Sequence, residues 1–396
     1  MIFSESAANL RTSEIRDLMS LAGRDDIISF AGGMPDNNLF PINDINDIYN
    51  NFTTKEKQIA MQYGPTPGLP SLIESLGQYL KKKGLPVESN KILITTGSLQ
   101  AINIFSKIFI DPNSPILVEN PCFIGAISAF KSYQANIKSI ELTKDGINIE
   151  NLENFLTSSD KKPRFFYFTP NFHNPAGVLY SIDTKKKLIQ LFSGQGIPII
   201  EDDVYSDLFF YDEDASHLTP LKSINPQDID VCYTGSFSKI LGPGLRLGWM
   251  LVSPTIYEKC ELVKQSFDAC SPSFTQLIAD KFLRTGKVYA YTKAVKEEYK
   301  ERCLLMSKLL NEQLPDSIHF HTPRGGFYFW LSLPESINAT DILKKAIKKG
   351  ALFVSGKTFD PDGKKDNHIR LSFCNTSKEQ IMKGIPKIIE SIKELV

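Results

Sequence analysis

Short apolar segments alternate with helical patterns over about 180 residues, from residue 71 to residue 252. The expected strands are apolar on both faces, which is typical of strands buried between two layers of helices. Strand–helix alternation of this kind predicts an open, mainly parallel α/β sheet. Such sheets bind ligands beyond the carboxyl ends of their strands. Polar residues that directly follow a strand are therefore the first candidates for a functional site.

The hydrophobic periodicity gives the approximate bounds of these elements. We expect strands at 91–95, 116–118, 137–142, 164–169, 197–200, 231–234 and 248–252, and helices at 71–83, 99–110, 125–132 and 184–193. In the last of these helices, Lys185, Lys186 and Lys187 are expected on the solvent side.

The pattern changes after residue 255, where strands become fewer and a long helix is expected at 288–314. Further helices are expected at 254–267, 274–284, 340–349 and 378–395, and strands at 326–333, 352–354 and 369–373. This pattern predicts a second, α+β domain, and at about 150 residues per domain the length of 396 residues suits two or three domains. The first forty residues are too few to fold alone, so we expect them to pack on the second domain or on a partner subunit.

Charge and cysteine usage exclude several classes of protein. Lys plus Arg equals Asp plus Glu, at 45 each, which argues against nucleic acid or a polybasic membrane surface as the main partner. No apolar run approaches the roughly 18 residues of a membrane helix, and the first twenty residues contain no secretory signal pattern, so a cytoplasmic protein is expected. The six cysteines stand singly in apolar segments, which indicates buried free thiols rather than disulfides or a metal site.

The strongest local motif follows the strand at 231–234. It reads Gly-Ser-Phe-Ser-Lys, with Lys239 at its end, and continues with a glycine-rich stretch that includes Arg246. Such loops present N–H and hydroxyl donors to a phosphate, here with Ser236 and Ser238, and the absence of GxxxxGK[ST] disfavours ATP or GTP hydrolysis. Lys239 is suited to form a Schiff base with an aldehyde cofactor. Taken alone, the motif also fits a surface turn with a solvated lysine.

Three acidic residues, Glu201, Asp202 and Asp203, follow the strand at 197–200. Carboxylates at the end of a buried strand need a partner because burying them unpaired is costly. One of them facing the pyridine nitrogen of pyridoxal 5′-phosphate (PLP) would keep that nitrogen protonated. The alternative for Glu201 or Asp203 is a helix N-cap.

Three weaker candidates complete the set. Asn174 follows the strand at 164–169 in an Asn-Pro turn and has an amide that can donate to a phenolate oxygen. Ser98 lies where a strand runs into a helix, which suits either a phosphate site or an ordinary N-cap. Arg370 interrupts an apolar strand, which indicates either a bound substrate carboxylate or a structural ion pair.

In their order along the chain, these motifs resemble those of the fold-type-I PLP-dependent aminotransferases of class I/II. The similarity is greatest to the branch with 2-aminoadipate, kynurenine and broad-specificity aromatic or branched-chain aminotransferases. It extends from residue 28 to residue 370, and its most specific motif is SxSKxxxPGLRxGW at 236–249. The segments at 63–69 and 323–327 add to it.

The resemblance implies PLP as cofactor and assigns roles to the residues around its ring. Lys239 is implied as the Schiff-base lysine, which also moves the proton between the substrate Cα and C4′ of the cofactor. Asp202 pairs with the pyridinium nitrogen, Asn174 and Tyr205 bind the phenolic oxygen, and Phe123 stacks on the ring.

The resemblance also implies that Ser98, Ser236 and Arg246 bind the cofactor phosphate. It implies that Arg370 binds the substrate α-carboxylate, that Gly33 forms part of the pocket wall, and that Arg16 approaches the substrate side chain. Tyr63 is implied to reach the phosphate bound by the other subunit of a homodimer. Two departures, Leu99 where the family often has Gln and Ala176 where it often has Thr, predict somewhat weaker cofactor binding.

The implied fold is that of PLP-dependent transferases of type I, with a mainly parallel seven-stranded sheet in a large domain and a smaller α+β domain. The PLP-binding domain is expected at 46–283, and the smaller domain at 1–45 together with 284–396.

The implied function is transfer of an amino group from an L-amino acid (2-aminoadipate, aromatic or branched-chain) to a 2-oxo acid such as 2-oxoglutarate. Two alternatives keep the cofactor: a C–S lyase or decarboxylase of the same fold, and the PLP-sensing part of a transcriptional regulator. Regulators of this kind carry an added N-terminal DNA-binding domain, for which the segment before the first matching residues leaves no room. A nucleotide-binding α/β enzyme is disfavoured because both GxGxxG and a P-loop are absent.

Overall fold

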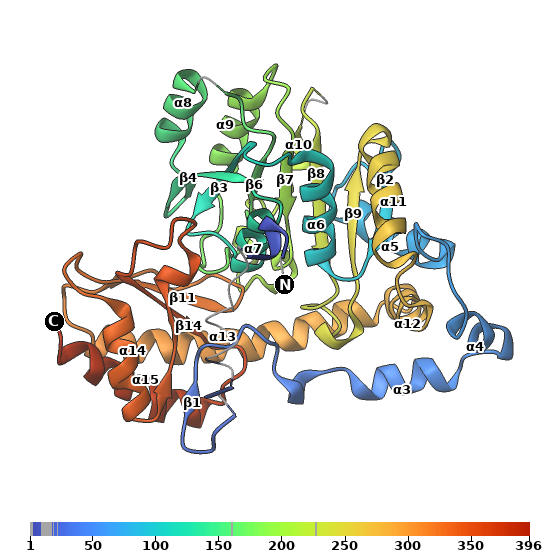
Figure 1. The fold of residues 1–396 in the computed structure, drawn as a ribbon. Helices are drawn as coiled ribbons and strands as arrows, with labels where there is room; N and C mark the ends of the chain where they lie inside the picture. Colours follow the sequence, from blue (N-terminus) through green and yellow to red (C-terminus); the bar gives the residue numbers. More distant parts are fainter. Residues whose placement is uncertain (1–2, 9–17, 19, 22, 160, 226–227) are drawn as a thin grey trace.

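The computed structural model describes residues 3–8, 18, 20–21, 23–159, 161–225 and 228–396. Its largest sheet has eight strands in this part of the chain (Figure 1). From edge to edge they are β2 (Lys91–Thr95), β9 (Gly248–Val252), β8 (Val231–Ser236), β7 (Ile199–Asp202), β6 (Phe166–Phe168), β3 (Pro115–Asn120), β4 (Asn136–Thr143) and β5 (Gly146–Ile147).

The predicted α/β class and mainly parallel sheet are confirmed. Strands β8, β7, β6, β3 and β4 run parallel, whereas β9 is antiparallel to both of its neighbours, β2 and β8. The sheet has one strand more than the seven expected. The additional strand is β5, which contains two residues and forms a hairpin with β4. Two residues are too few to show a recognisable period-two pattern.

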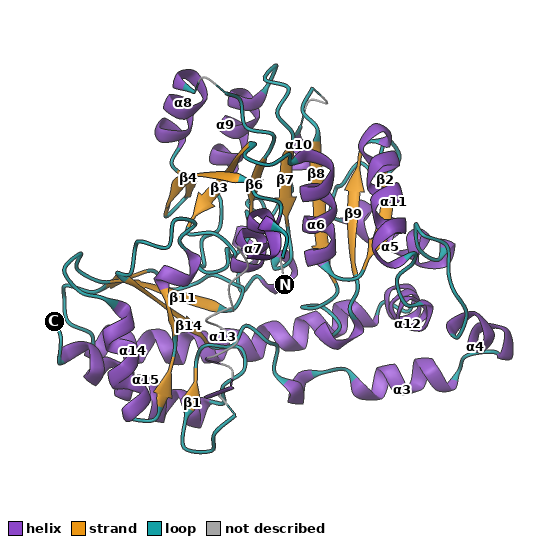
Figure 2. Cartoon of the chain, viewed as in Figure 1, coloured by secondary structure: helices purple, strands orange, loops and turns teal. Residues whose placement is uncertain are grey.

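Helices cover both faces of this sheet (Figure 2). One face packs against α6 (Ser98–Phe109), α7 (Ile124–Ser132) and α11 (Pro254–Asp268). The other face packs against α5 (Pro70–Lys82), α8 (Ile149–Ser158), α9 (Ile182–Phe192), α10 (Leu221–Ile224) and α12 (Ser273–Arg284). Strand β3 shows why the strand patterns are apolar throughout: Ile116 and Val118 face one helical layer, while Leu117 faces the other.

The long helix α13 (Lys287–Gln313) passes below the sheet in Figure 1 and leads to the C-terminal elements. These include an antiparallel sheet of β10 (His319–Phe320), β11 (Tyr328–Ser332), β14 (His368–Ser372) and β13 (Val354–Ser355), with helices α14 (Ala339–Lys348) and α15 (Lys378–Lys393). We keep the division of the chain at 45/46 and 283/284 as a proposal, and α13 begins directly after the second of these positions.

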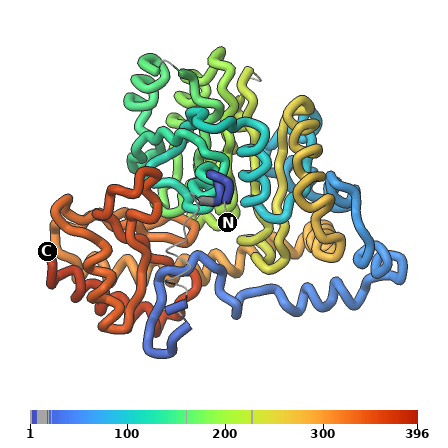
Figure 3. The backbone as a smooth tube through the Cα atoms, viewed as in Figure 1, coloured from blue at the N-terminus to red at the C-terminus, as the bar shows by residue number. Residues whose placement is uncertain are grey.

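The start of the chain returns to its C-terminal part, as the tube in Figure 3 makes easy to follow. Strand β1 (Ile28–Ser29) pairs in parallel with β12 (Ala351–Leu352), so the expected packing on the second part of the chain is confirmed for this segment. Before it lies α1 (Glu5–Ala8), and after it α3 (Ile42–Asn50) and α4 (Thr54–Ala60) run back toward α12. The strand expected at 352–354 is two strands, β12 and β13, which belong to different sheets.

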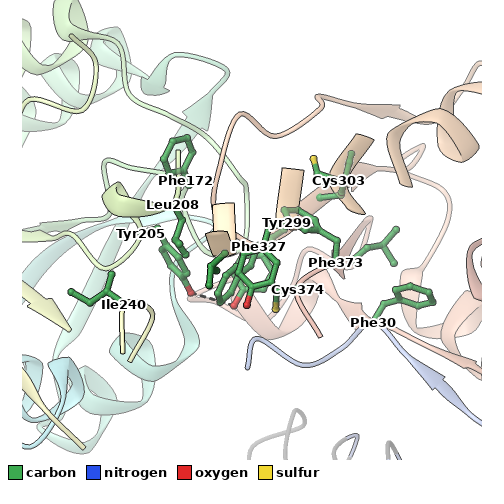
Figure 4. Packing of buried hydrophobic residues seen from close by; sticks show 14 of the residues in the cluster. Phe30, Phe172, Tyr205, Leu208, Ile240, Tyr299, Cys303, Phe327, Phe373 and Cys374 are labelled. Carbon is green, nitrogen blue, oxygen red and sulfur yellow. Dashed lines mark hydrogen bonds between the residues drawn. The ribbon is translucent and has the colours of Figure 1, made fainter. Parts of the chain in front are cut away.

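One apolar cluster joins the large sheet to the C-terminal elements. Figure 4 shows Tyr205 and Leu208, from the loop after β7, next to Phe327 and Tyr299. The Tyr205 and Phe327 rings lie 5.4 Å apart, and those of Tyr299 and Phe327 lie 5.2 Å apart. The loop that follows β7 therefore packs against aromatic side chains from the C-terminal part of the chain.

The expectation for Lys185 is wrong. Its side chain is fully buried, and its Nζ donates to the carbonyl oxygens of His217 (2.6 Å) and Thr219 (2.9 Å). These carbonyls belong to the loop after β7, so an ammonium group of α9 is hydrogen-bonded by a segment about thirty residues away. The six cysteines are free, and all but Cys270 are buried. No helix among the described residues combines the length and apolarity that a membrane crossing requires.

Candidate active site

The predicted site residues meet in a cavity of about 400 Å³ at the carboxyl ends of β7 and β8. Those that line it are Gly33, Ser98, Phe123, Asn174, Asp202, Tyr205, Ser236, Lys239, Arg246 and Arg370. Of the other two predicted residues, Tyr63 does not line it and has 86% of its surface exposed, and Arg16 lies outside the described residues.

Asp202 ends β7 and is buried, with 3% of its surface exposed. Its Oδ2 accepts a hydrogen bond from the Tyr167 hydroxyl at 2.6 Å, while its Oδ1 is buried and has no protein partner among the described residues. Burial raises the pKa of Asp202 to about 7, although the hydrogen bond from Tyr167 favours the charged form. The free oxygen in the cavity is suited to a cationic N–H group.

The acids on either side of Asp202 have structural partners. Glu201 accepts from the backbone N–H groups of Leu221 and Lys222 at the start of α10. It therefore binds a helix N-terminus as an N-cap side chain would, although the N-cap position of α10 is Pro220. Asp203 accepts from Asn171 and from the Tyr233 hydroxyl. Asp202 is thus the one acid of the three that faces the cavity.

Lys239 follows β8, is half-buried and lines the cavity, a position that does not favour the alternative of a solvated surface lysine. Its Nζ donates to the Gly33 carbonyl oxygen at 3.0 Å and lies 5.8 Å from the ring centre of Tyr205 and 5.2 Å from that of Phe327. Burial lowers the pKa of Lys239 to about 8. A substantial neutral fraction at physiological pH makes this amine both a nucleophile and a base.

The turn between β2 and α6 brings an arginine to a helix N-terminus. Gly97 has φ of +81° and precedes Ser98, the first residue of α6. A Cβ atom on Gly97 would lie 2.8 Å from Nη2 of Arg246, and one on Gly248 would lie 2.7 Å from the Ser98 nitrogen. The helix start, the Arg246 guanidinium and the nearby Ser236 hydroxyl form a cradle that suits an anion such as a phosphate.

Arg370, in β14, is a buried guanidinium with neutral partners. Its Nη1 donates to Oδ1 of Asn174 at 2.9 Å and its Nη2 to the Ala31 carbonyl oxygen at 2.5 Å, while its Nε has no partner among the described residues. Burial lowers the pKa of Arg370. No carboxylate in the described part of the chain forms an ion pair with it, so the geometry does not support the structural ion-pair alternative.

Two tyrosines of the site carried no signal in the sequence. The Tyr328 hydroxyl lies 3.2 Å from that of Tyr205, and its ring packs under the Arg370 guanidinium at 4.5 Å. Tyr167 binds Asp202 from the neighbouring strand β6. Both occur within apolar strand patterns, in which a tyrosine is predicted to be a core residue. Their proximity to predicted site residues was visible only once the strand order was known.

A larger cavity, of about 1080 Å³, shares no residue with this one. Its wall includes His217, His319, His321 and His368, and the Lys365–Glu141 ion pair also lies there. None of the predicted site residues lines it, so its size does not identify it as the active site.

Comparison with known proteins places this geometry in a family. The model for aminotransferase class I and II matches residues 27–388. Aromatic-amino-acid aminotransferase 1 of Thermococcus litoralis is 36% identical, over 99% of this chain and 94% of its own length.

Two solved structures share both sequence and fold with the chain. The kynurenine aminotransferase of Pyrococcus horikoshii, in complex with PMP, has a TM-score of 0.95 at 36% identity and covers 99% of this chain and 97% of its own. The α-aminoadipate aminotransferase of Thermus thermophilus, complexed with N-(5′-phosphopyridoxyl)-L-leucine, has a TM-score of 0.89 at 30% identity, with coverage of 99% and 97%. The chain belongs to the class I and II aminotransferases and is a PLP-dependent aminotransferase.

Proposed function

We propose that the cavity containing Lys239 and Asp202 binds pyridoxal 5′-phosphate. The observation that carries the proposal is that these two ionisable groups line one cavity, Asp202 buried and Lys239 half-buried, and that neither has an ion-pair partner among the described residues. Burying such groups unpaired is costly, so the site is built for a ligand that supplies the partners. An aldehyde and a pyridine nitrogen are partners of the right chemistry. The PMP and phosphopyridoxyl complexes of the two related structures support this choice.

The remaining groups of the cofactor have candidate partners in the same cavity. We assign the phosphate to Ser98, Ser236 and Arg246, and the ring face to Phe123. Because Oδ1 of Asn174 accepts from Arg370, its NH₂ group remains to donate to the phenolic oxygen, together with the Tyr205 hydroxyl.

When bound, PLP supplies an electron sink that makes the Cα–H bond of an amino acid acidic. Lys239 takes the Cα proton on Nζ and returns it at C4′, a role that suits a pKa of about 8. Asp202 holds the proton on the ring nitrogen. Arg370 binds the α-carboxylate of the amino acid and fixes the orientation of its Cα–H bond. The same groups then act in reverse order on an incoming 2-oxo acid.

The cavity wall favours donors with bulky apolar or aromatic side chains. Met34, Leu99 and Ile124 line it, and its charged residues among those described are the four already assigned to the cofactor and the α-carboxylate. A second carboxylate, as in 2-aminoadipate or in the expected acceptor 2-oxoglutarate, needs a further cation. We assign Arg16, which lies outside the described residues, to that carboxylate.

We also propose that the chain acts as a homodimer with shared active sites. Met61 and Tyr63 each expose 86% of their surface, and Tyr49 and Phe274 are also exposed on the adjacent helices α3 and α12. A single chain leaves this face open to water, and a second copy would cover it. Tyr63 is then placed to reach the phosphate held by the partner. Free cysteines support a cytoplasmic location.

The test uses the purified protein with PLP and a panel of amino acids, without any 2-oxo acid. We expect an aromatic donor to change the absorbance of the bound cofactor and to yield its matching 2-oxo acid. Pyruvate with ammonia and a thiol would indicate a C–S lyase, and carbon dioxide a decarboxylase. Lys239→Ala should form no product while keeping its thermal midpoint, and measurable turnover in that variant would refute the assignment of Lys239.

A further inference from the structure

The hydroxyl of Tyr167 is the only group in the described part of the chain that donates a hydrogen bond to Asp202. Tyr167 lies at the centre of β6, opposite Ile200 of β7, so its side chain reaches along the strand to the carboxylate two residues further on. The two oxygen atoms are 2.6 Å apart, and the Tyr167 side chain is fully buried. This contact divides the carboxylate into one bound oxygen and one free oxygen.

The other groups that face Asp202 disfavour its charged form. Glu119 of β3 and Asp203 both raise its pKa through their negative charges, and burial raises it further. The Cys122 thiol, which follows β3, also lies close enough to interact with it. No cation among the described residues opposes these effects. The Tyr167 hydroxyl is therefore the protein group among those described that favours the charged form of the Asp202 carboxylate.

The Tyr167 ring is held independently of this hydrogen bond. It packs edge-on against Phe130 of α7, with ring centres 5.4 Å apart. Burial and the charge of Asp202 raise the pKa of the hydroxyl well above its usual value, so it stays protonated as a donor. Removal of the oxygen alone should leave the ring in place.

We propose that Tyr167 is a positioning residue for the ring nitrogen of the cofactor, acting through Asp202. By binding Oδ2, the phenol turns Oδ1 into the cavity and favours the ionised form of the carboxylate, which is the form that can hold a proton on that nitrogen. The inference rests on the proposed function, in which Asp202 pairs with the cofactor.

The structure offers a matched control on the other side of β7. Tyr233, in β8, is equally buried and donates to Oδ2 of Asp203 at 2.8 Å. Asp203 does not line the cavity. Tyr167→Phe and Tyr233→Phe thus remove the same atom from the same kind of contact, but only the first contact lies behind the site.

The first experiment compares single-turnover rates of the two variants with PLP and an amino donor. Tyr167→Phe should slow the half-reaction about 10-fold or more, which is typical for loss of a hydrogen bond to a charged group. The donor KM should change little, and Tyr233→Phe should keep the wild-type rate. In an Asp202→Asn background, Tyr167→Phe should have no further effect. An undiminished effect in that background would mean a structural role and overturn the inference.

The second experiment needs no turnover. Infrared spectroscopy of the PLP-free protein follows the protonated carboxyl band that is lost in Asp202→Asn. The pH midpoint of this band should be higher in Tyr167→Phe than in the wild type, and unchanged in Tyr233→Phe. Equal midpoints in all three proteins would overturn the inference. Full activity of Asp202→Asn would instead refute the proposed role of Asp202, which separates the two failures.

Discussion

Two buried arginines show how a binding residue differs from a structural one. Arg302 of α13 pairs with the carboxylates of Asp36 (2.7 Å) and Glu298 (2.9 Å). Among the described residues, Arg370 donates only to the neutral oxygens of Asn174 and Ala31. A buried guanidinium is best satisfied by carboxylates. Arg370 therefore has unused capacity for an anion, whereas Arg302 has none.

This contrast predicts opposite effects of the same substitution. Arg370→Lys should raise the KM for the amino donor roughly 10- to 100-fold, because a forked contact with the α-carboxylate is lost. PLP binding should be unaffected. Arg302→Lys should lower the thermal midpoint and leave the donor KM unchanged. Steady-state kinetics and thermal unfolding of both variants check the prediction, and an unchanged KM in Arg370→Lys would contradict it.

Asp202 should make the stability of the PLP-free protein depend on pH. Its pKa rises from 3.8 to about 7 on folding, which corresponds to roughly 4 kcal/mol. Between these values the folded protein binds more protons than the unfolded chain, so this group lowers stability as the pH rises. Denaturant unfolding should show the advantage of Asp202→Asn growing from pH 4 to pH 7. Saturating PLP should reverse that advantage, and a pH-independent difference would contradict the prediction.

At the scale of elements, the site depends on a close approach of two backbones. The turn before α6 touches β9 at Gly248, and Gly97 adopts a positive φ beside Arg246. A Cβ atom on Gly248 would collide with the backbone of Gly97 and Ser98, and one on Gly97 would displace the Arg246 guanidinium. The cradle for the phosphate thus exists only while both positions lack a Cβ atom.

Gly97→Ala should weaken PLP binding for a reason that a matched variant can isolate. Gly84, after α5, has the same φ of +81°, but a Cβ atom there would meet nothing closer than 3.9 Å. Backbone strain should cost Gly84→Ala about 1 kcal/mol and Gly97→Ala about 1–3 kcal/mol, because Gly97 combines φ of +81° with ψ of 164°, a conformation that essentially only glycine adopts. Only Gly97→Ala displaces Arg246, so its PLP dissociation constant should rise while that of Gly84→Ala stays constant. Fluorescence titration with PLP measures both.

The elements also show what a sequence can predict. Asp202 and Lys239 were found because each lies at or just beyond the carboxyl end of a buried strand, and these strand ends meet at one edge of a parallel sheet. Tyr167 was missed because its partner lies on another strand, 35 residues away. Lys185 was misplaced for the same reason, since its acceptors are 32 and 34 residues further on. Local sequence patterns predict the helix or strand to which a residue belongs. Its contacts with residues distant in the sequence can be predicted only when the strand order is known.

The whole molecule leaves an apolar face uncovered around α3, α4 and α12. The exposed side chains there are Tyr49 of α3, Phe274 of α12, and Met61 and Tyr63, which follow α4. If this face binds a second copy, disruption of the contact should remove both the dimer and the activity.

Met61→Asp should convert the protein to a monomer and reduce PLP affinity, because a charge would be buried in the contact and Tyr63 would leave the partner's site. Met382→Asp is the control: Met382 is also exposed, at 51%, but lies on α15. Analytical ultracentrifugation at several protein concentrations gives the oligomeric state of each variant. A dimeric, active Met61→Asp protein would exclude this face as the interface.

The segment that follows β1 presents three carbonyl oxygens to buried or half-buried donors, two of which, on Arg370 and Lys239, belong to the site. Those of Ala31, Gly33 and Met34 accept from Arg370, Lys239 and the Cys374 thiol, respectively. Ligand binding is therefore an exchange. A substrate carboxylate must displace the carbonyl oxygen bound to Arg370, and the cofactor aldehyde must displace the one bound to Lys239. Each measured affinity is then the difference between two sets of hydrogen bonds. A moderate dissociation constant at this site is compatible with strong individual contacts, and loosening the segment should tighten binding without any change in the residues that touch the ligand.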